Sequence, residues 1–244
     1  MERKGVPVNS GSERARRYDA SRRQEQARLG RERIMDVALE KFLANGFAAT
    51  TVAAIAMAAA VSPDTIYKAF GGKPGLVRAL CERGLEGGGP TPAEHRSDAL
   101  QQFEHNPHQL MLALGQLASE VAPRVAPLLL LLKAAVDTDP DMARLLTEFN
   151  DSRLQRMTDN ARRMVGRGII RNDLTVEEAG EISWLYTSPE LYGLLVGDRG
   201  WSPERFGTFI GHSLAAALLP PTDKADRSSG SASGSEPQDT SPDR

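Results

Sequence analysis

The segment "VSPDTIYKAF" (residues 61–70) gathers hydrogen-bonding and cationic side chains directly after a run of alanines. Residues 62–65 offer two hydroxyl groups and a carboxylate, which can meet the edges of DNA bases or cap a helix. Tyr67 and Lys68 follow on what would be an outward face, from which they can reach phosphate oxygens. The chemistry indicated is non-covalent recognition of a polyanion.

Three short helices must position these groups. A first helix over residues 29–45 carries an apolar face that includes Ile34 and Phe42, and "NGF" ends it at Gly46. A second helix follows Thr50 or Thr51 as its N-cap. Ser62 caps the third, with Pro63 at its first position, and this helix ends near Phe70. A fourth runs from residue 73 or 74 to about residue 85.

The order of these helices describes a helix-turn-helix, in which the N-terminal end of the second motif helix meets the major groove. Ala56 and Ala59 are small enough for two helices to cross closely, and Val61 and Ile66 can close the small core. Taken alone, the same pattern also fits a small helical hairpin with ordinary caps.

Residues 31–85 resemble the DNA-binding domain of the TetR family of transcriptional repressors. The shared landmarks are "NGF", "TTV..IA", "VS..TIY..F" and "K..L", in this order and spacing. The resemblance implies an all-helical dimer that binds a near-palindromic operator. It also implies DNA contacts at matching positions, and our candidate DNA-binding residues are Thr51, Ser62, Pro63, Asp64, Thr65, Tyr67, Lys68, Lys73, Arg28 and Arg31.

One position departs from the family pattern. Ala60 stands in the turn between the two motif helices, where the family usually has glycine. If this residue must be left-handed, alanine costs on the order of 1 kcal/mol. The pose of the third helix depends on this turn.

The N-terminal segment is basic. Residues 1–33 hold ten Lys or Arg against five Asp or Glu, while the whole chain has a net charge of −2. We expect residues 1–28 to be a disordered Arg-rich arm that contacts phosphates or the minor groove, and the alternative is a solvated tail. The polar segment 220–244 is also expected to be disordered.

The end of the second domain, residues 174–219, resembles the C-terminal end of TetR-like proteins more loosely. Two subunits of that family share a four-helix bundle, and the alternative is burial within one subunit. The predicted dimerisation residues are Leu191, Leu195, Phe206, Ile210, Leu214 and Leu218.

The middle helices are expected to form a pocket for a small-molecule effector, largely because the resemblance implies one. The apolar candidates are Phe103, Met111, Leu114, Leu128, Phe149, Met157 and Trp184, and residues of these types are individually more often plain core than pocket lining. Possible polar anchors are His105, His108, Gln116, Asn150 and Arg153, and nothing in the sequence selects among them.

The composition favours an all-α fold, because aromatic residues make up 5% and long Val/Ile/Thr alternations are missing. The longest apolar run, residues 125–136, is too short for a membrane span and holds Lys133. No signal sequence or membrane span is recognised, so we expect a cytoplasmic protein. Neither "EHNPH" nor "DTDPD" has metal-ligand spacing, and no nucleophile elbow or phosphate loop occurs. We therefore expect no catalytic site, no metal and no cofactor.

The sequence thus predicts a helix-turn-helix DNA-binding domain at residues 29–75 and a larger helical ligand-binding and dimerisation domain at residues 76–219, linked by a helix over residues 73–85. The predicted function is a homodimeric transcriptional regulator, a repressor released from a palindromic operator by a small molecule. The alternative is a helical binding or interaction protein that does not read DNA, and its support is Ala60 and the acidic Asp64.

Overall fold

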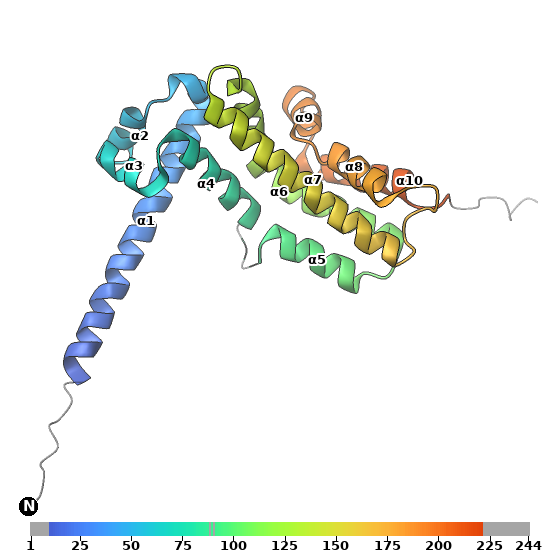
Figure 1. The fold of residues 1–244 in the computed structure, drawn as a ribbon, viewed down its shortest axis with the longest axis horizontal. Coiled ribbons are helices and arrows are strands. Elements are labelled where there is room, and N and C mark those ends of the chain that lie inside the picture. The colour runs from blue at the N-terminus through green and yellow to red at the C-terminus, as the bar shows by residue number, and fades with distance from the viewer. Residues whose placement is uncertain (1–9, 88, 90, 222–244) are drawn as a thin grey trace, which may run out of the picture.

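The computed structural model describes residues 10–87, 89 and 91–221, and over this part of the chain every regular element is a helix. The all-α prediction is confirmed. Figure 1 shows a long N-terminal helix that projects away from a helical body, with two short helices packed beside its C-terminal part. None of the described helices is long and apolar enough to cross a membrane.

The N-terminal unit consists of α1 (Ser10–Ala49), α2 (Val52–Ala58) and α3 (Pro63–Phe70), followed by α4 (Lys73–Glu86). Gly46 breaks α1 with a φ of 78°, as the "NGF" pattern predicts. The hydroxyl groups of Thr51 and Ser62 accept hydrogen bonds from backbone N–H groups at the starts of α2 and α3. Local capping chemistry therefore sets the beginnings of both motif helices.

The N-terminal arm differs from its prediction where the structure describes it. Residues 10–28 are not disordered but continue α1 as one helix, and residues 1–9 lie outside the described part. Residues 21–29 are all exposed, so no core holds this segment. Arginine, glutamine, glutamate and alanine are good helix formers, and Arg28 pairs with Glu25 one turn earlier at 2.7 Å. Helix propensity and this ion pair therefore extend the helix over residues 21–29 without burial of apolar side chains.

The second domain contains α5 (Ala93–Phe103), α6 (Pro107–Ala135), α7 (Pro140–Gly166), α8 (Val176–Tyr186), α9 (Pro189–Tyr192), a π-helical segment (Gly193–Asp198) and α10 (Pro203–Leu218). Pro189 begins α9, which follows α8 after a short break. α6 passes through Pro123 and Pro127 without ending. It packs against α10 and α4.

Two apolar cores organise the molecule. The first joins α1–α4 to the C-terminal half of α6 and the start of α7, and includes Phe42, Ile66, Leu76 and Leu132. The second joins the N-terminal half of α6 to α7, α8 and α10. The apolar core of the DNA-binding domain predicted for residues 29–75 is therefore continuous with apolar side chains of the second domain.

The apolar stripe of α10 belongs to the second core. Phe206, Ile210, Leu214 and Leu218 are each at most 3% exposed in the single chain, and α10 packs along α6 more extensively than along any other described helix. The prediction that these four residues form the dimer contact is wrong. Their periodicity identified a buried face, but α6 of the same subunit covers it.

Glycine makes this helix contact possible. A Cβ atom added at Gly115 of α6 would collide with the backbone of α10 and lie 2.8 Å from the Cα of Gly211. The two backbones therefore touch where side chains would hold them apart.

We predict that Gly115→Ala lowers the free energy of unfolding by about 1–3 kcal/mol, because α10 must move away from α6. The matched control is Gly30→Ala in α1, where an added Cβ meets no atom within 4 Å. That change should stabilise the helix by up to about 1 kcal/mol. Urea unfolding measures both, and an unchanged stability of Gly115→Ala would contradict the close α6–α10 contact.

Candidate nucleic-acid interface

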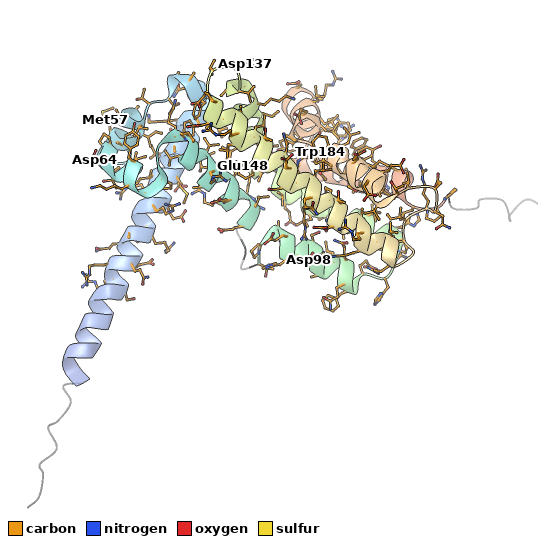
Figure 2. All side chains as sticks on the ribbon, in the orientation of Figure 1. Met57, Asp64, Asp98, Asp137, Glu148 and Trp184 are labelled. Carbon is orange, nitrogen blue, oxygen red and sulfur yellow. The ribbon has the colours of Figure 1, made fainter. Side chains whose placement is uncertain are left out.

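The N-terminal end of α3 presents exposed polar side chains, while the apolar side chains of this helix are buried. Residues 62–65 are exposed, and so are Tyr67 and Lys68, whereas Ile66 and Phe70 are buried in the first core. Tyr67 is 56% exposed. The alternation follows the helical period, so one face anchors α3 and the other is free to meet a partner. Figure 2 places Asp64 at the outer end of the molecule, far from Trp184 in the second domain.

Two hydroxyl groups hold the start of α3. The Ser62 Oγ accepts from the backbone N–H of Thr65 at 3.2 Å and lies 2.9 Å from the Thr65 Oγ1. Asp64 occupies the first turn, where a carboxylate favours the positive end of the helix dipole. Lys68 occupies the last turn, where a cation is favoured. The segment that sequence analysis selected therefore forms an ordered helix start with its polar groups outward.

The turn before α3 depends on Ala60. Its φ is 53°, and it is the single non-glycine residue with positive φ in the described part of the chain. Alanine thus takes the left-handed conformation that the family's glycine would take, and the turn keeps its geometry at a cost in strain. Ala56 and Ala59 are at most 1% exposed, which agrees with the predicted close helix crossing. Ala60 therefore gives no structural support to the alternative that the protein does not read DNA.

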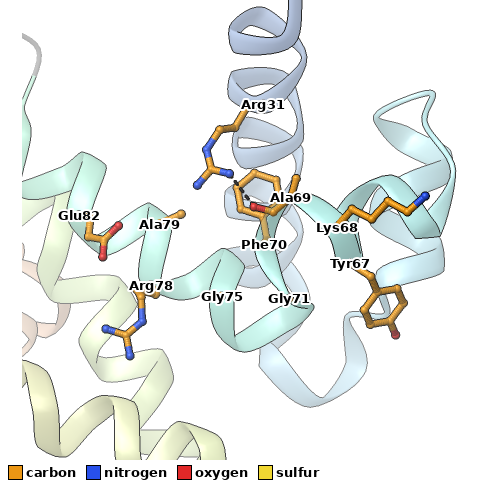
Figure 3. A pocket seen from close by; sticks show the side chains of 10 residues that line it. All are labelled: Arg31, Tyr67, Lys68, Ala69, Phe70, Gly71, Gly75, Arg78, Ala79 and Glu82. Atoms are coloured by element: carbon orange, nitrogen blue, oxygen red, sulfur yellow. Dashed lines mark hydrogen bonds between the residues drawn. The ribbon is translucent and has the colours of Figure 1, made fainter.

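Two arginines of α1 form hydrogen bonds that hold the helix-turn-helix in position, and this role was not predicted from the sequence. The Arg33 Nε donates to the carbonyl of Ala59 at 3.0 Å. The Arg31 guanidinium donates to the carbonyl of Ala69 at 2.7 Å and lies 4.1 Å from the centre of the Phe70 ring, as Figure 3 shows. Arg31 therefore positions α3, and its contact with DNA stays a prediction.

Lys73 also has a structural role, and its contact with DNA stays a prediction. Its ammonium donates to the carbonyl of Phe47 at 2.7 Å and lies 4.0 Å from the centre of the Phe47 ring. Burial lowers the pKa of Lys73 below its ordinary value. Arg28, by contrast, is exposed on α1 and paired with Glu25, and its contact with DNA stays a prediction.

Two further features of this face could not be read from the motif. Met57 is 80% exposed on α2 and lies at the same end of the molecule as Asp64 (Figure 2). Met57 lies off the apolar face of α2, and this position is the sequence signal from which its exposure could have been predicted. An open groove of about 460 Å³ lies between α3 and α4, and Arg31, Tyr67, Lys68 and Arg78 are among its lining residues (Figure 3).

Residues 34–80 match the family model described as bacterial regulatory proteins, tetR family. The N-terminal unit therefore carries the helix-turn-helix domain of TetR-family transcriptional regulators. Its helix-turn-helix is therefore the DNA-binding element of a transcriptional regulator.

Similar proteins agree with this assignment. An HTH-type transcriptional regulator of Bacillus subtilis (strain 168), YvkB, is 26% identical over 168 residues, covering 69% of this chain and 85% of YvkB. NalD, the secondary repressor of the MexAB-OprM multidrug efflux pump in Pseudomonas aeruginosa, superposes with a TM-score of 0.62 at 18% identity, covering 79% of this chain and 98% of NalD. A putative transcriptional regulator from Saccharomonospora viridis in complex with choline gives a TM-score of 0.59 at 17% identity, with coverages of 78% and 98%.

The apolar residues predicted for the effector pocket are divided between the two cores and the surface. Phe103 is 70% exposed, Met111 is buried in the second core, and Leu128 is buried in the first. Leu114 is partly buried against the second core and Phe149 against the first. Met157 and Trp184 are half-buried. Among the predicted polar anchors, His105, His108 and Gln116 are exposed, whereas Arg153 contacts Trp184.

No cluster of three or more His, Cys, Asp or Glu that could hold a metal ion occurs among the described residues. Cys81 is buried in the first core, and burial raises the pKa of its thiol to about 12. The thiol is therefore protonated at neutral pH and acts as a small apolar group.

We predict that Ala60→Gly raises the free energy of unfolding by about 0.5–1 kcal/mol. Relief of the left-handed strain exceeds the extra freedom that glycine gives the unfolded chain. The control is Ala58→Gly, at an exposed helical position, which should lower stability by up to about 1 kcal/mol. Thermal unfolding of the two variants tests the turn, and a loss of stability in both would contradict the strained conformation of Ala60.

Proposed function

We propose that this regulator acts as a homodimeric repressor whose two α3 helices bind successive major grooves of a near-palindromic operator. The exposed N-terminal face of α3, on a turn that keeps left-handed geometry at Ala60, carries this proposal. In this proposal Ser62, Thr65 and Asp64 contact base edges, with Asp64 able to accept from a cytosine N4 amino group. Tyr67 and Lys68 contact phosphates, and so does Thr51 at the start of α2.

A second copy of this chain is the partner we assign to three exposed apolar residues of the second domain, which we propose form one face. Leu185 of α8 is 59% exposed, Leu194 of the π-helical segment is 57% exposed, and Phe209 of α10 is 36% exposed. The Phe209 ring meets Trp201 edge-to-face, with 5.7 Å between ring centres. Large exposed apolar side chains in adjoining helices favour an interface. This face takes the place of the α10 stripe that the sequence predicted. Of the other two predicted dimerisation residues, the half-buried Leu195 lies beside Leu194 in the π-helical segment, and the half-buried Leu191 lies in α9 directly before it.

A small-molecule effector bound in the second domain would release the protein from DNA. The solved structure of the Saccharomonospora viridis regulator holds choline, which shows that a protein of this fold binds a small molecule. An effector changes DNA affinity only by its different affinities for the DNA-fitting and non-fitting arrangements of the dimer. The shared first core, which runs from α3 to α6 and α7, supplies a packed connection between the two functions.

We predict that Lys68→Gln weakens binding to a fluorescein-labelled duplex selected by its affinity for the wild-type protein. Removal of one phosphate contact should reduce the slope of log K against log salt concentration by about one unit per subunit. The control is Arg144→Gln, an exposed cation on α7 that pairs with Asp141. Fluorescence anisotropy measures both variants, and an unchanged slope for Lys68→Gln would remove this residue from the interface.

We predict that Phe209→Glu converts the dimer to monomers, because two carboxylates would be placed in the interface. Leu43→Glu is the matched control, since Leu43 is 51% exposed on α1 of the N-terminal unit. Light scattering after size-exclusion chromatography gives the mass of each variant. A Phe209→Glu protein that stays dimeric at low concentration would exclude this face as the dimer contact.

A further inference from the structure

Arg153 of α7 is stacked on Trp184 near the end of α8. The guanidinium carbon lies 4.4 Å from the centre of the indole, and the Arg153 Nη1 donates to the Trp184 carbonyl at 2.5 Å. Burial lowers the pKa of the Arg153 guanidinium to about 10, and this desolvation is the largest cause of the shift. A cation is therefore held in a place where water solvates it poorly.

Two hydrogen-bond donors of this pair lack an acceptor. The Arg153 Nε and the Trp184 Nε1 are both inaccessible to solvent and have no hydrogen-bond partner among the described residues. A buried donor left unpaired costs roughly 1–3 kcal/mol, and more when the group is charged. Two such donors on stacked side chains form a site that is complementary to an acceptor.

The charges around Arg153 and Trp184 indicate that the missing hydrogen-bond acceptor is an anion. Glu190 of α9 is the acid that stabilises the charged form of Arg153, but its carboxylate accepts a hydrogen bond from the Lys133 Nζ at 2.7 Å. Two cations on α6 and α7 therefore share a single carboxylate on α9. One negative charge would complete this cluster.

We propose that Arg153 and Trp184 form the recognition site for a small organic monocarboxylate. The guanidinium would bind the carboxylate, and the indole would supply an N–H donor and a flat apolar surface for the carbon skeleton. This inference rests on the proposed function, because the carboxylate would be the effector of the regulator.

The position of the pair explains how a carboxylate could act on the dimer. Trp184 lies three residues before the break at Thr187 and Ser188, after which α9 and the π-helical segment carry Leu194. Leu185, the next residue, is exposed on the proposed dimer face. Because both unpaired donors are buried, a carboxylate must move the indole off the guanidinium, and this movement displaces the joint between α8 and α9. Figure 2 shows Trp184 in this region of the second domain.

The test uses the fluorescence of Trp184 in the full chain. The chain has two tryptophans, so Trp201→Phe leaves Trp184 as the single reporter. Benzoate and octanoate are titrated as probes, and benzamide and octanamide are their uncharged matches. We expect a saturable change in Trp184 emission, with at least one carboxylate binding about tenfold or more tightly than its amide.

Arg153→Gln should remove this preference for the carboxylate, whereas Arg162→Gln should keep it. Arg162 is an exposed arginine on the same helix that pairs with Asp159 at 2.5 Å. If circular dichroism shows that Arg153→Gln does not fold, the ratio between carboxylate and amide affinities in the Trp201→Phe protein decides the matter.

The inference is overturned if neither carboxylate changes Trp184 emission saturably, if the amides bind as tightly, or if folded Arg153→Gln keeps the preference. Binding to the selected duplex is assayed in parallel with the wild-type protein, because Trp201 contacts Phe209 of the proposed dimer face. DNA binding without a carboxylate response overturns this inference alone. A carboxylate response that depends on Arg153, in a protein that binds no DNA, supports the site and overturns the proposed function.

Discussion

The shared apolar core between the N-terminal helices and the second domain is the constraint on which the rest of the structure depends. Leu76 and Val77 of α4 are fully buried in it, together with Ile66 of α3 and Leu132 of α6. The helix that presents residues to DNA is therefore packed, through α4, against helices of the effector domain. A surface ion pair also joins α4 to the second domain, because Arg78 of α4 pairs with Glu148 of α7 at 2.5 Å. A packed core transmits displacement because it is close to incompressible.

A helix cap, a turn and a hydrogen bond fix the orientation of α3 on this core. Ser62 starts α3, Ala60 turns the chain into it, and Arg31 holds its end against α1. Each of these contacts is worth on the order of 1 kcal/mol, so none dominates the stability of the unit. Together they leave one face of an eight-residue helix exposed and ordered before any DNA is bound. Such preorganisation lowers the conformational cost of binding.

Local chemistry was predictable from the sequence, and the choice of packing partners was not. Ser62–Pro63, Thr175 with Glu178, and Ser202–Pro203 all start helices as their side-chain chemistry indicates. The stripe at Phe206 and Ile210 was correctly read as buried, but periodicity cannot tell whether α6 or a second subunit covers it. Proline in a helix interior is locally unfavourable, yet α6 continues through Pro123 and Pro127. Arg31 and Lys73 matched family positions, yet their carbonyl and ring partners lie 26 or more residues away and are visible only in the fold.

The central claim is that two copies of this chain present α3 to successive major grooves. Selection of bound duplexes from a random DNA pool by the purified protein tests it most directly, because symmetry and spacing can be read from the enriched sites. The account predicts an inverted repeat whose half-sites are centred about one helical turn, roughly 10 base pairs, apart or a small multiple of it. Enrichment of an asymmetric single site, or no enrichment beyond salt-sensitive non-specific binding, would contradict it.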